Sequence, residues 1–420
     1  MPTETKNRHS IMFWILMISA QVGAFLIFKD LADISQWLVQ SSREFTMGVW
    51  YNRWGITIAT LLALAASVVI WRKQRVPGGG VMSALVLLCL FNLYAGMINT
   101  KLMFRPQMHE GQAKFVSVEE APTFLSQMSH ASYESERFES PDEINVIVLE
   151  TDEGAIAYTD YYLLQPHVVT AGPIDGEEVI MTYCGLTNMG VAYSPVIGDQ
   201  KVDLRVMTQL RNNLVMLDMN TGEPIQQMWG SMEKDGEHGP AMKEWPTLRM
   251  PFGSFKELYP DGRVYVNGID QQSDNPFVRF FDYIVRDGMM LHAVRTLQWQ
   301  SDKPAFPTIE EFDDRLPVKA LVYGISIDND HVAYTQEFVS EQGGIVNVTI
   351  GGTPIVIYND EKYDSLVAFY NSSGKEVSSV DLFGNSGDGV LERVETLKSK
   401  IFWFIWRDFY KQTDLNRIEV

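Results

Sequence analysis

Three apolar runs in the first quarter of the chain limit its fold more than any other feature. They are IMFWILMISAQVGAFLIF (residues 11–28), WGITIATLLALAASVVIW (54–71) and VMSALVLLCLFNLYAGMI (81–98). Each has 18 residues without a charge, which as a helix spans roughly 27 Å, about the hydrocarbon core of a bilayer. The first run lacks a small-x-small cleavage site and two more follow, which argues against a cleaved signal peptide. The sequence predicts three transmembrane helices within residues 1–105.

The charges beside these runs predict their orientation. Arg72, Lys73 and Arg75 lie between the second and third runs with no acidic residue, and Lys6 and Arg8 precede the first run. Basic residues favour the cytoplasmic side of a membrane. We therefore expect a cytoplasmic N-terminus in the cell (inner) membrane, contact with membrane lipid, and a large C-terminal domain that is periplasmic or outside the cell.

The rest of the chain is acidic. Residues 1–105 contain ten Lys or Arg and four Asp or Glu, whereas residues 106–420 contain 24 and 49, a balance of −25. A domain with this charge repels phosphate backbones, so we expect no nucleic-acid partner.

Strand-like segments of the acidic part occur twice. VIVLETDEGAIAYT (residues 146–159) returns 176 residues later as VYGISIDNDHVAYT, IDGEEVIMTYC returns as IGGTPIVIYN, and GVAYSPVIG returns as LVAFYNSSG. Near the two ends, FKELYPD is matched by WRDFYKQ. Each copy is typical of short strands with Gly, Asp and Asn turns, closed by an aromatic helix.

These patterns together predict the fold class and the domain boundaries. We expect a membrane-anchored α+β chain, in which three transmembrane helices precede a β-rich soluble body made of two related units. A connector covers residues 106–143, unit one covers 144–316, and unit two covers 317–420 with a C-terminal aromatic helix.

Several motifs of the body occur in a known order. They are AYT, HVVTAG, VIMTYCGLT, NNLVMLDMNTGEPI, SFKELYPD, RLPVKALVYGI and FWFIW. Over most of residues 144–417 this order resembles the prokaryotic domain of unknown function three-one-seven-nine. The biochemistry of that family is largely unassigned, but many members are described as selenoprotein candidates. The resemblance therefore implies redox reactivity at Cys184, the cysteine of the TYC motif.

The chain departs from the family pattern at several positions. The second family cysteine is Thr187 here, the ND pair is Ala171 and Gly172, and the tryptophan of SLW is Ile225. These departures argue against a dithiol mechanism and favour a non-catalytic role.

Cys184 is the first candidate site residue. It ends an expected strand directly before Gly185, where backbone N–H groups can lower the pKa of a thiol. The other cysteine, Cys89, lies in the third apolar run, so the body cannot form an internal disulfide. Burial as a small apolar residue is the alternative. We expect a reactive, partly accessible thiol or a metal-bound one.

His167 and Met181 are candidate partners of this thiol. His167 lies 17 residues before Cys184, on an expected neighbouring strand, where it could accept the thiol proton or share a metal with it. Met181 belongs to a stretch, residues 181–250, that contains nine of the twenty methionines. Thiolate, imidazole and thioether together suit copper. Core packing of the histidine and the methionines is the alternative.

Asn213, Asp218 and Thr221 complete the candidate set. Asp218 and Thr221 fit a turn that ends a strand, because short polar side chains accept hydrogen bonds from the backbone just after them. The family motif contains the same residues, so we also expect all three to line a cleft above Cys184.

Two functions follow from these patterns, and whether the chain is an enzyme stays open. The first is thiol-redox or copper handling through Cys184 and His167 in a membrane-anchored extracytoplasmic protein. The alternative is a non-catalytic accessory subunit that docks onto a larger membrane complex or onto further copies of itself.

Overall fold

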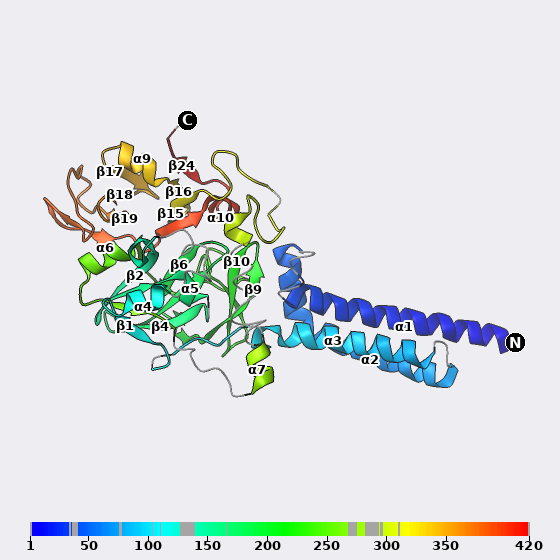
Figure 1. The fold of residues 1–420 in the computed structure, drawn as a ribbon. Helices are drawn as coiled ribbons and strands as arrows, with labels where there is room; N and C mark the ends of the chain where they lie inside the picture. Colours follow the sequence, from blue (N-terminus) through cyan, green and yellow to red (C-terminus); the bar gives the residue numbers. More distant parts are fainter. Residues whose placement is uncertain are drawn as a thin grey trace. The chain divides into compact units, whose positions relative to one another are not determined.

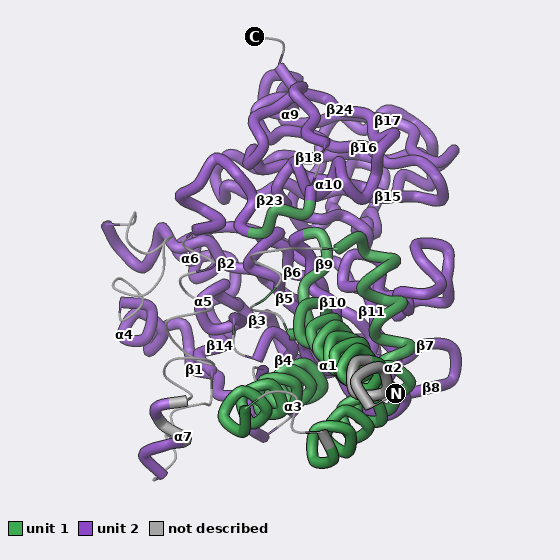
Figure 2. The backbone as a smooth tube through the Cα atoms, turned by 90° about the vertical axis from the view of Figure 1, so that its right-hand side faces the viewer, with its two compact units in different colours: residues 1–103, 207–211, 306–308 green, residues 104–206, 212–305, 309–420 purple. Residues whose placement is uncertain are grey.

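The computed structural model describes most of the chain (Figure 1). The described residues are 2–32, 35, 41–74, 78–102, 104–109, 111–126, 139–164, 166–267, 275–281, 294, 297–309 and 311–418. Arg75 and parts of the expected connector lie outside them. Two compact units are distinguished in Figure 2: residues 1–103, 207–211 and 306–308 form the first, and the remaining residues form the second.

Long helices dominate the first unit. They are α1 (Pro2–Leu31), α2 (Arg43–Gln74) and α3 (Gly79–Leu102). Their stretches Arg8–Leu31, Arg43–Lys73 and Gly79–Lys101 are long and apolar enough to cross a membrane. The prediction of three apolar N-terminal helices is confirmed.

Glycines allow these helices to approach one another closely. A Cβ atom added at Gly23 would overlap the Thr60 hydroxyl, and one added at Gly96 would overlap the Ile27 carbonyl. Only a hydrogen atom fits at these two positions. The backbone of α1 therefore lies close to α2 and to α3, as small residues allow between membrane helices.

The body that follows is rich in strands. In its first part they are β1 (Phe115–Ser117), β2 (Asn145–Thr151), β3 (Gly154–Tyr158), β4 (Val168–Ile174), β5 (Glu177–Cys184), β6 (Met189–Tyr193), β7 (Val196–Ile197), β8 (Gln200–Lys201), β9 (Leu204–Leu210), β10 (Asn213–Asp218), β11 (Pro224–Gln226), β12 (Glu244–Trp245), β13 (Leu248–Pro251) and β14 (Arg263–Tyr265). In its second part they are β15 (Leu321–Ile327), β16 (Asp330–Tyr334), β17 (Ile345–Ile350), β18 (Thr353–Asp360), β19 (Ser365–Tyr370), β20 (Asn385–Ser386), β21 (Gly389–Val390), β22 (Glu392–Arg393), β23 (Lys398–Phe402) and β24 (Asp414–Asn416). Among the described residues, five propeller-like sheets have three to five strands each, and two more sheets have two strands each.

Two of these sheets share one strand order. One contains β13–β2–β3–β14, with β1 added at its edge, and the other contains β23–β15–β16–β24. In each set of four strands, the first two neighbouring pairs are antiparallel and the last pair is parallel. The sheets β4–β5–β6–β12 and β17–β18–β19–β22 are also alike, since every neighbouring pair in both is antiparallel.

Short helices follow corresponding strands. Helices α5 (Asp160–Leu163) and α9 (Gln336–Glu341) follow β3 and β16, and each begins after a threonine whose hydroxyl accepts a backbone N–H of the first turn. Helices α6 (Phe252–Leu258) and α10 (Trp403–Phe409) follow β13 and β23. The predicted C-terminal aromatic helix is α10, whose seven residues are too few to span a bilayer. The described residues also form helices α4 (Ala121–Leu125) and α7 (Pro276–Phe281) and the 3₁₀ turn Pro141–Glu143.

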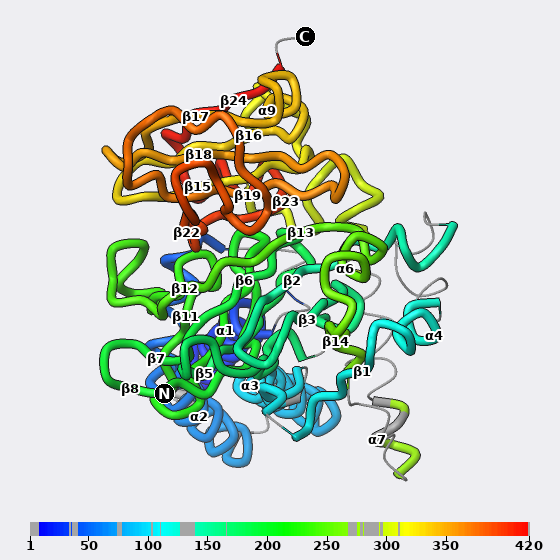
Figure 3. The backbone as a smooth tube through the Cα atoms, turned by 90° about the vertical axis from the view of Figure 1, so that its left-hand side faces the viewer, coloured from blue at the N-terminus to red at the C-terminus, as the bar shows by residue number. Residues whose placement is uncertain are grey.

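One apolar core joins the two parts of the body. Buried side chains of β2 and β13, such as Val146 and Met250, belong to the same cluster as Val356, Val367 and Phe369 of β18 and β19. Figure 3 shows the strands beyond residue 320, drawn in yellow to red, gathered beside β13 and β2. The two parts therefore bury apolar surface against each other, which stabilises them as one body.

The aromatic helix α10 gives a prediction about packing. A Cβ atom added at Gly324 in β15 would lie 2.6 Å from Cδ2 of the Trp406 indole, and both residues are buried. Because a buried indole cannot move aside, we expect Gly324→Ala to lower the free energy of unfolding by about 1–3 kcal/mol. Denaturant unfolding measures this.

A second glycine provides the control for that experiment. A Cβ atom at Gly190 would meet the end of the Ile147 side chain, which can adopt another rotamer. We expect a smaller loss for Gly190→Ala. Equal losses for the two variants would show that the rigidity of the indole is not the cause.

Candidate functional site

Cys184 is the last residue of β5. It pairs with Met189 of β6 across the turn 185–188, in which Asn188 has a φ of 57°. The side chain of Cys184 is 4 % exposed. The position at the end of a strand is as predicted, but the expected accessibility is wrong, because the following turn and neighbouring strands cover the thiol.

Several donors surround the sulfur of Cys184. The hydroxyl of Thr187 and the backbone N–H groups of Thr187, Leu186 and Leu214 stabilise the thiolate. Burial acts in the opposite direction and is the larger effect, so the pKa of Cys184 is raised above its ordinary value. The thiol is therefore protonated at neutral pH, although donors that would stabilise a thiolate are in place.

His167 lies directly before β4 and is bonded to Tyr183, the residue before Cys184. Its Nδ1 is 2.9 Å from the carbonyl oxygen of Tyr183, and its own carbonyl accepts the N–H of Tyr183. Because a carbonyl can only accept, Nδ1 carries the proton and Nε2 is the basic nitrogen. Burial lowers the pKa of His167 to about 4. No hydrogen bond joins His167 to Cys184 in the described part of the chain.

The buried imidazole predicts a pH dependence of stability. The pKa of His167 falls from 6.5 to about 4 on folding, so the unfolded chain binds this proton more readily than the folded one. The stabilisation is complete above pH 6.5 and is lost as the pH falls towards 4, by roughly 3 kcal/mol in total. Denaturant unfolding between pH 7.5 and 4 measures it.

The control for this prediction is His167→Asn. His167 has a φ of 72°, a left-handed conformation that asparagine tolerates better than most residues. The variant has no titrating group at position 167, so its stability should change less over this interval. If the difference in unfolding free energy between the wild-type protein and His167→Asn does not depend on pH, His167 is not buried in its neutral form.

Met181 and Cys184 point to opposite faces of β5, because side chains alternate along a strand. Met181 is fully buried and belongs to one core cluster with Val179 and Tyr183. Within the described residues, no group of three or more His, Cys, Asp or Glu is placed to hold a metal ion. The geometry therefore favours core packing for Met181 over a ligand set shared with Cys184.

Asp218 and Thr221 form the turn that their sequence predicts. The Asp218 carboxylate accepts the N–H groups of Asn220 and Thr221 and the hydroxyl of Thr221, the last at 2.5 Å. Asn213 is fully buried and accepts the N–H of Leu214, while its Nδ2 has no partner among the described residues. None of the three candidates lines the cleft described next.

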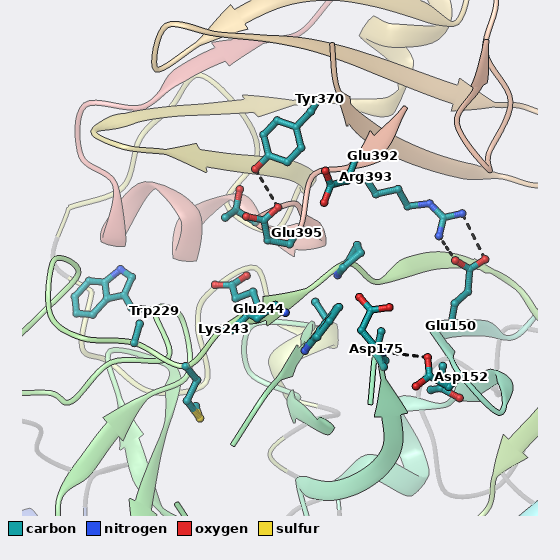
Figure 4. Close-up of a pocket in the computed structure, with 17 residues that line it drawn as sticks. Glu150, Asp152, Asp175, Trp229, Lys243, Glu244, Tyr370, Glu392, Arg393 and Glu395 are labelled. Atoms are coloured by element: carbon teal, nitrogen blue, oxygen red, sulfur yellow. Dashed lines mark hydrogen bonds and ion pairs between the residues drawn. The ribbon is translucent and has the colours of Figure 1, made fainter. Parts of the chain in front are cut away.

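A cleft of about 800 Å³ opens elsewhere in the body (Figure 4). It lies between the turns and strands of the first part and the segment 370–396 of the second. Six carboxylates line it: Glu150, Asp152, Asp175, Glu244, Glu392 and Glu395. Three aromatic side chains line it as well, namely Trp229, Trp245 and Tyr370. The cationic side chains in its lining are Lys243 and Arg393.

Ion pairs neutralise two of the six carboxylates. Arg393 pairs with Glu150, and Lys398, which lies behind the wall, pairs with Glu244. Burial raises the pKa of Glu244, Lys398 opposes this, and the charge of Glu395 adds to it. Lys243 pairs with Glu177 outside the lining.

The other four carboxylates have no cationic partner in the described structure. Asp152 accepts the N–H groups of Asp175 and Gly176, and Glu395 accepts the hydroxyl of Tyr370 at 3.0 Å. These bonds orient the carboxylates but leave their charge uncompensated. The cleft is therefore an acidic site with aromatic walls.

Residues 120–413 match the model of a family described as Protein of unknown function (DUF3179). The chain belongs to the DUF3179 family. This confirms the resemblance drawn from the motifs of the body. No curated protein and no solved structure shows a significant match.

The DUF3179 match begins after the three apolar helices and contains the whole cleft. Sequence reasoning missed this site because its carboxylates are spread from Glu150 to Glu395 and form no motif. The only signal was the charge of the acidic part, which indicates that acidic residues gather somewhere but not where. Their convergence depends on the packing of one part of the body against the other.

Proposed function

We propose that the body of this DUF3179 protein is a non-catalytic binding module that takes up a positively charged organic ligand in the acidic cleft. The supporting observation is the cleft itself, which is lined by four carboxylates without a cationic partner among the described residues. Carboxylates brought together repel one another, and a cation between them relieves that repulsion.

The aromatic walls favour an organic cation over a bare ion. Ammonium groups are attracted to the faces of tryptophan and tyrosine rings. Lys243 already uses this contact, because its Nζ lies 3.8 Å from the centre of the Trp245 ring. A ligand with an ammonium group and an aliphatic part would meet both kinds of lining.

Calorimetric titration of the full-length protein in detergent tests the proposal. We expect n-butylamine, protonated at pH 7.5, to bind, and n-butanol and butyrate not to bind. Affinity should fall between 50 and 300 mM salt, because added salt screens the carboxylates. Equal binding of the three probes, or binding of none, would refute a cation site.

Glu395→Gln tests which residues form this site. The amide keeps an acceptor for the Tyr370 hydroxyl while removing the charge, so we expect about tenfold weaker binding of n-butylamine. Glu341→Gln, at an exposed position at the end of α9, is the matched control and should leave binding unchanged.

We also infer that the body contains the two related units expected at residues 144–316 and 317–420. The matching strand orders and threonine caps support this inference. Backbone hydrogen bonds place Tyr183 opposite His167 and Asn359 opposite Gly344. Tyr183 therefore corresponds to Asn359, whereas the two repeated segments IDGEEVIMTYC and IGGTPIVIYN, aligned at their last residues, match Cys184 with Asn359. His167 corresponds to Gly344, and both have positive φ, 72° and 83°.

Thiol chemistry at Cys184 is the second candidate function. The donors around its sulfur, Thr187 and the N–H groups of Leu186 and Leu214, favour it. The burial of the thiol opposes it. Copper binding through Cys184 and His167 would also need further ligands, because no group of three or more His, Cys, Asp or Glu is placed to hold a metal among the described residues.

Docking to other membrane subunits and the extracytoplasmic position of the body remain proposals. Apolar residues of α1, α2 and α3 that are exposed within this chain are open to lipid or to further helices. Copurification in mild detergent tests docking. Protease added to intact cells tests orientation, and a body that stays protected would place it in the cytoplasm.

A further inference from the structure

We propose that helix α7 binds the surface of the lipid bilayer, into which it inserts the side chains of Phe277 and Phe280. The partner is lipid, at the boundary between the headgroups and the acyl chains. This contact gives the body a second attachment to the membrane, in addition to the chain that follows α3. It goes beyond the proposed ligand binding and does not depend on the acidic cleft.

The exposure of the two rings is the first argument. Phe277 is 84 % exposed and Phe280 is 64 % exposed. The other exposed phenylalanines in the described part of the body, Phe312 and Phe383, are 47 % and 43 % exposed, and the Phe383 ring packs against Tyr259. Neighbouring apolar side chains that are left in water mark a contact with an apolar partner.

The local structure of α7 turns both rings to one side. Asn275 precedes the helix, and its Oδ1 accepts the N–H of Phe277 at 2.9 Å. Pro276 follows in the first turn, where its missing N–H has no cost. Because residues three positions apart lie on the same face of a helix, Phe277 and Phe280 form one apolar face. Helices that lie in a membrane interface bury such a face.

The connection of the body to the apolar helices identifies the partner as lipid. Helix α3 ends at Leu102, and six residues later Met108 is fixed to the body. The N–H of Met108 bonds to the Val168 carbonyl, and its sulfur accepts the Tyr265 hydroxyl at 3.4 Å. Six residues span at most roughly 20 Å. With α3 in the bilayer, the end of β14 at Tyr265 is therefore held close to the lipid surface.

Helix α7 follows from this same end of the body. Figure 3 shows α7 apart from the sheets, at the end where β1 and β14 lie. Pro276 comes eleven residues after Tyr265, and a segment of this length reaches up to roughly 36–40 Å. The chain is therefore long enough to bring α7 to the bilayer. Because the apolar helices already hold the body there, the effective concentration of lipid is high and two rings suffice for contact.

Quenching by labelled lipids in nanodiscs tests the proposal. In a full-length chain without Cys89 and Cys184, Phe277→Cys is labelled with an environment-sensitive fluorophore, and the bilayer contains lipids with a nitroxide close to the headgroup. We expect the nitroxide to reduce the fluorescence about threefold or more, because this face of α7 lies in the headgroup layer. Replacement of the remaining ring by Phe280→Ser should weaken the quenching. The same substitution elsewhere, Phe312→Ser, is the matched control and should leave the quenching unchanged.

Two further label positions calibrate the measurement. Val390 lies in β21 and is 74 % exposed, so a fluorophore on Val390→Cys should face water and escape quenching. Ile58 belongs to the apolar part of α2 and is 57 % exposed within the chain, so a fluorophore on Ile58→Cys should be quenched. Thermal unfolding checks that each variant is folded.

Three outcomes would overturn the proposal. The first is quenching of the Phe277→Cys label that does not exceed that of the Val390→Cys label. The second is a shielded label that lipid does not quench and that becomes exposed when each nanodisc holds one chain, which would make a second copy of this chain the partner. The third is an unquenched label on Ile58→Cys, which would place the apolar helices outside the bilayer.

Discussion

Replacement of Lys398 by methionine is expected to destabilise the body by about 3–5 kcal/mol, because it leaves Glu244 buried without its partner. Lys398 in β23 forms an ion pair with Glu244 in β12, and the two side chains are only 4 % and 13 % exposed. Methionine has nearly the same volume as the lysine stem, so the loss would come from the unpaired charge. Denaturant unfolding of the full-length protein measures it.

The pH dependence of this variant follows from the same charge. Burial and the charge of Glu395 already raise the pKa of Glu244, and Lys398 opposes them. Without Lys398 the folded pKa rises further above the unfolded one. A raised folded pKa gives stability at low pH that is lost as the pH rises, so the deficit of Lys398→Met should be smaller at pH 5 than at pH 8.

Two controls accompany this measurement. Lys362 pairs with Glu257, and these side chains are 63 % and 57 % exposed, so Lys362→Met should change stability by no more than about 0.5 kcal/mol. The double variant Lys398→Met/Glu244→Gln removes the buried charge and should recover much of the lost stability. Equal losses of unfolding free energy in Lys398→Met and Lys362→Met would contradict the prediction that burial of the ion pair decides the effect.

Native Cys184 should react with a small thiol reagent at least about 100-fold more slowly than in the denatured chain. The thiol is 4 % exposed and its pKa is raised by burial, so reaction requires local opening of the structure. The measurement uses a Cys89→Ser background, in which Cys184 is the sole thiol.

An exposed thiol provides the reference for this experiment. Asp199 is an exposed residue of the β7–β8 turn, so Asp199→Cys in a chain without Cys89 and Cys184 should react rapidly in the native state. Fast native labelling of Cys184 would overturn the prediction and favour the thiol-redox function. Labelling that appears only after addition of a chelator would indicate a bound metal.

Features that depend on neighbouring residues in the sequence were predictable. The three helices follow from long apolar runs, because the burial of such residues in a bilayer is a property of each segment alone. The turn at Asp218 and Thr221 follows from side chains that bond to the adjacent backbone. The strand that ends at Cys184 follows from its β-branched and aromatic residues.

Features of the candidate site were predicted only in part. His167 directly precedes β4, which pairs with the strand β5 that ends at Cys184, so the spacing indicated the right neighbourhood. Strand alternation, however, separates Met181 from Cys184, and the hydrogen bond that the described structure gives the His167 side chain goes to the Tyr183 carbonyl. Sequence spacing gives proximity along the sheet but not the direction of each side chain.

The sequence by itself determined the three apolar helices, the DUF3179 motifs and the acidic character of the body, because these are properties of residue type and order. Only the tertiary structure decided that Cys184 is covered and that carboxylates from Asp152 to Glu395 meet in one cleft. The physical reason is that exposure and electrostatic environment depend on which distant segments pack together. Leu214 lies against the thiol of Cys184, and Lys398 compensates Glu244 from 154 residues away.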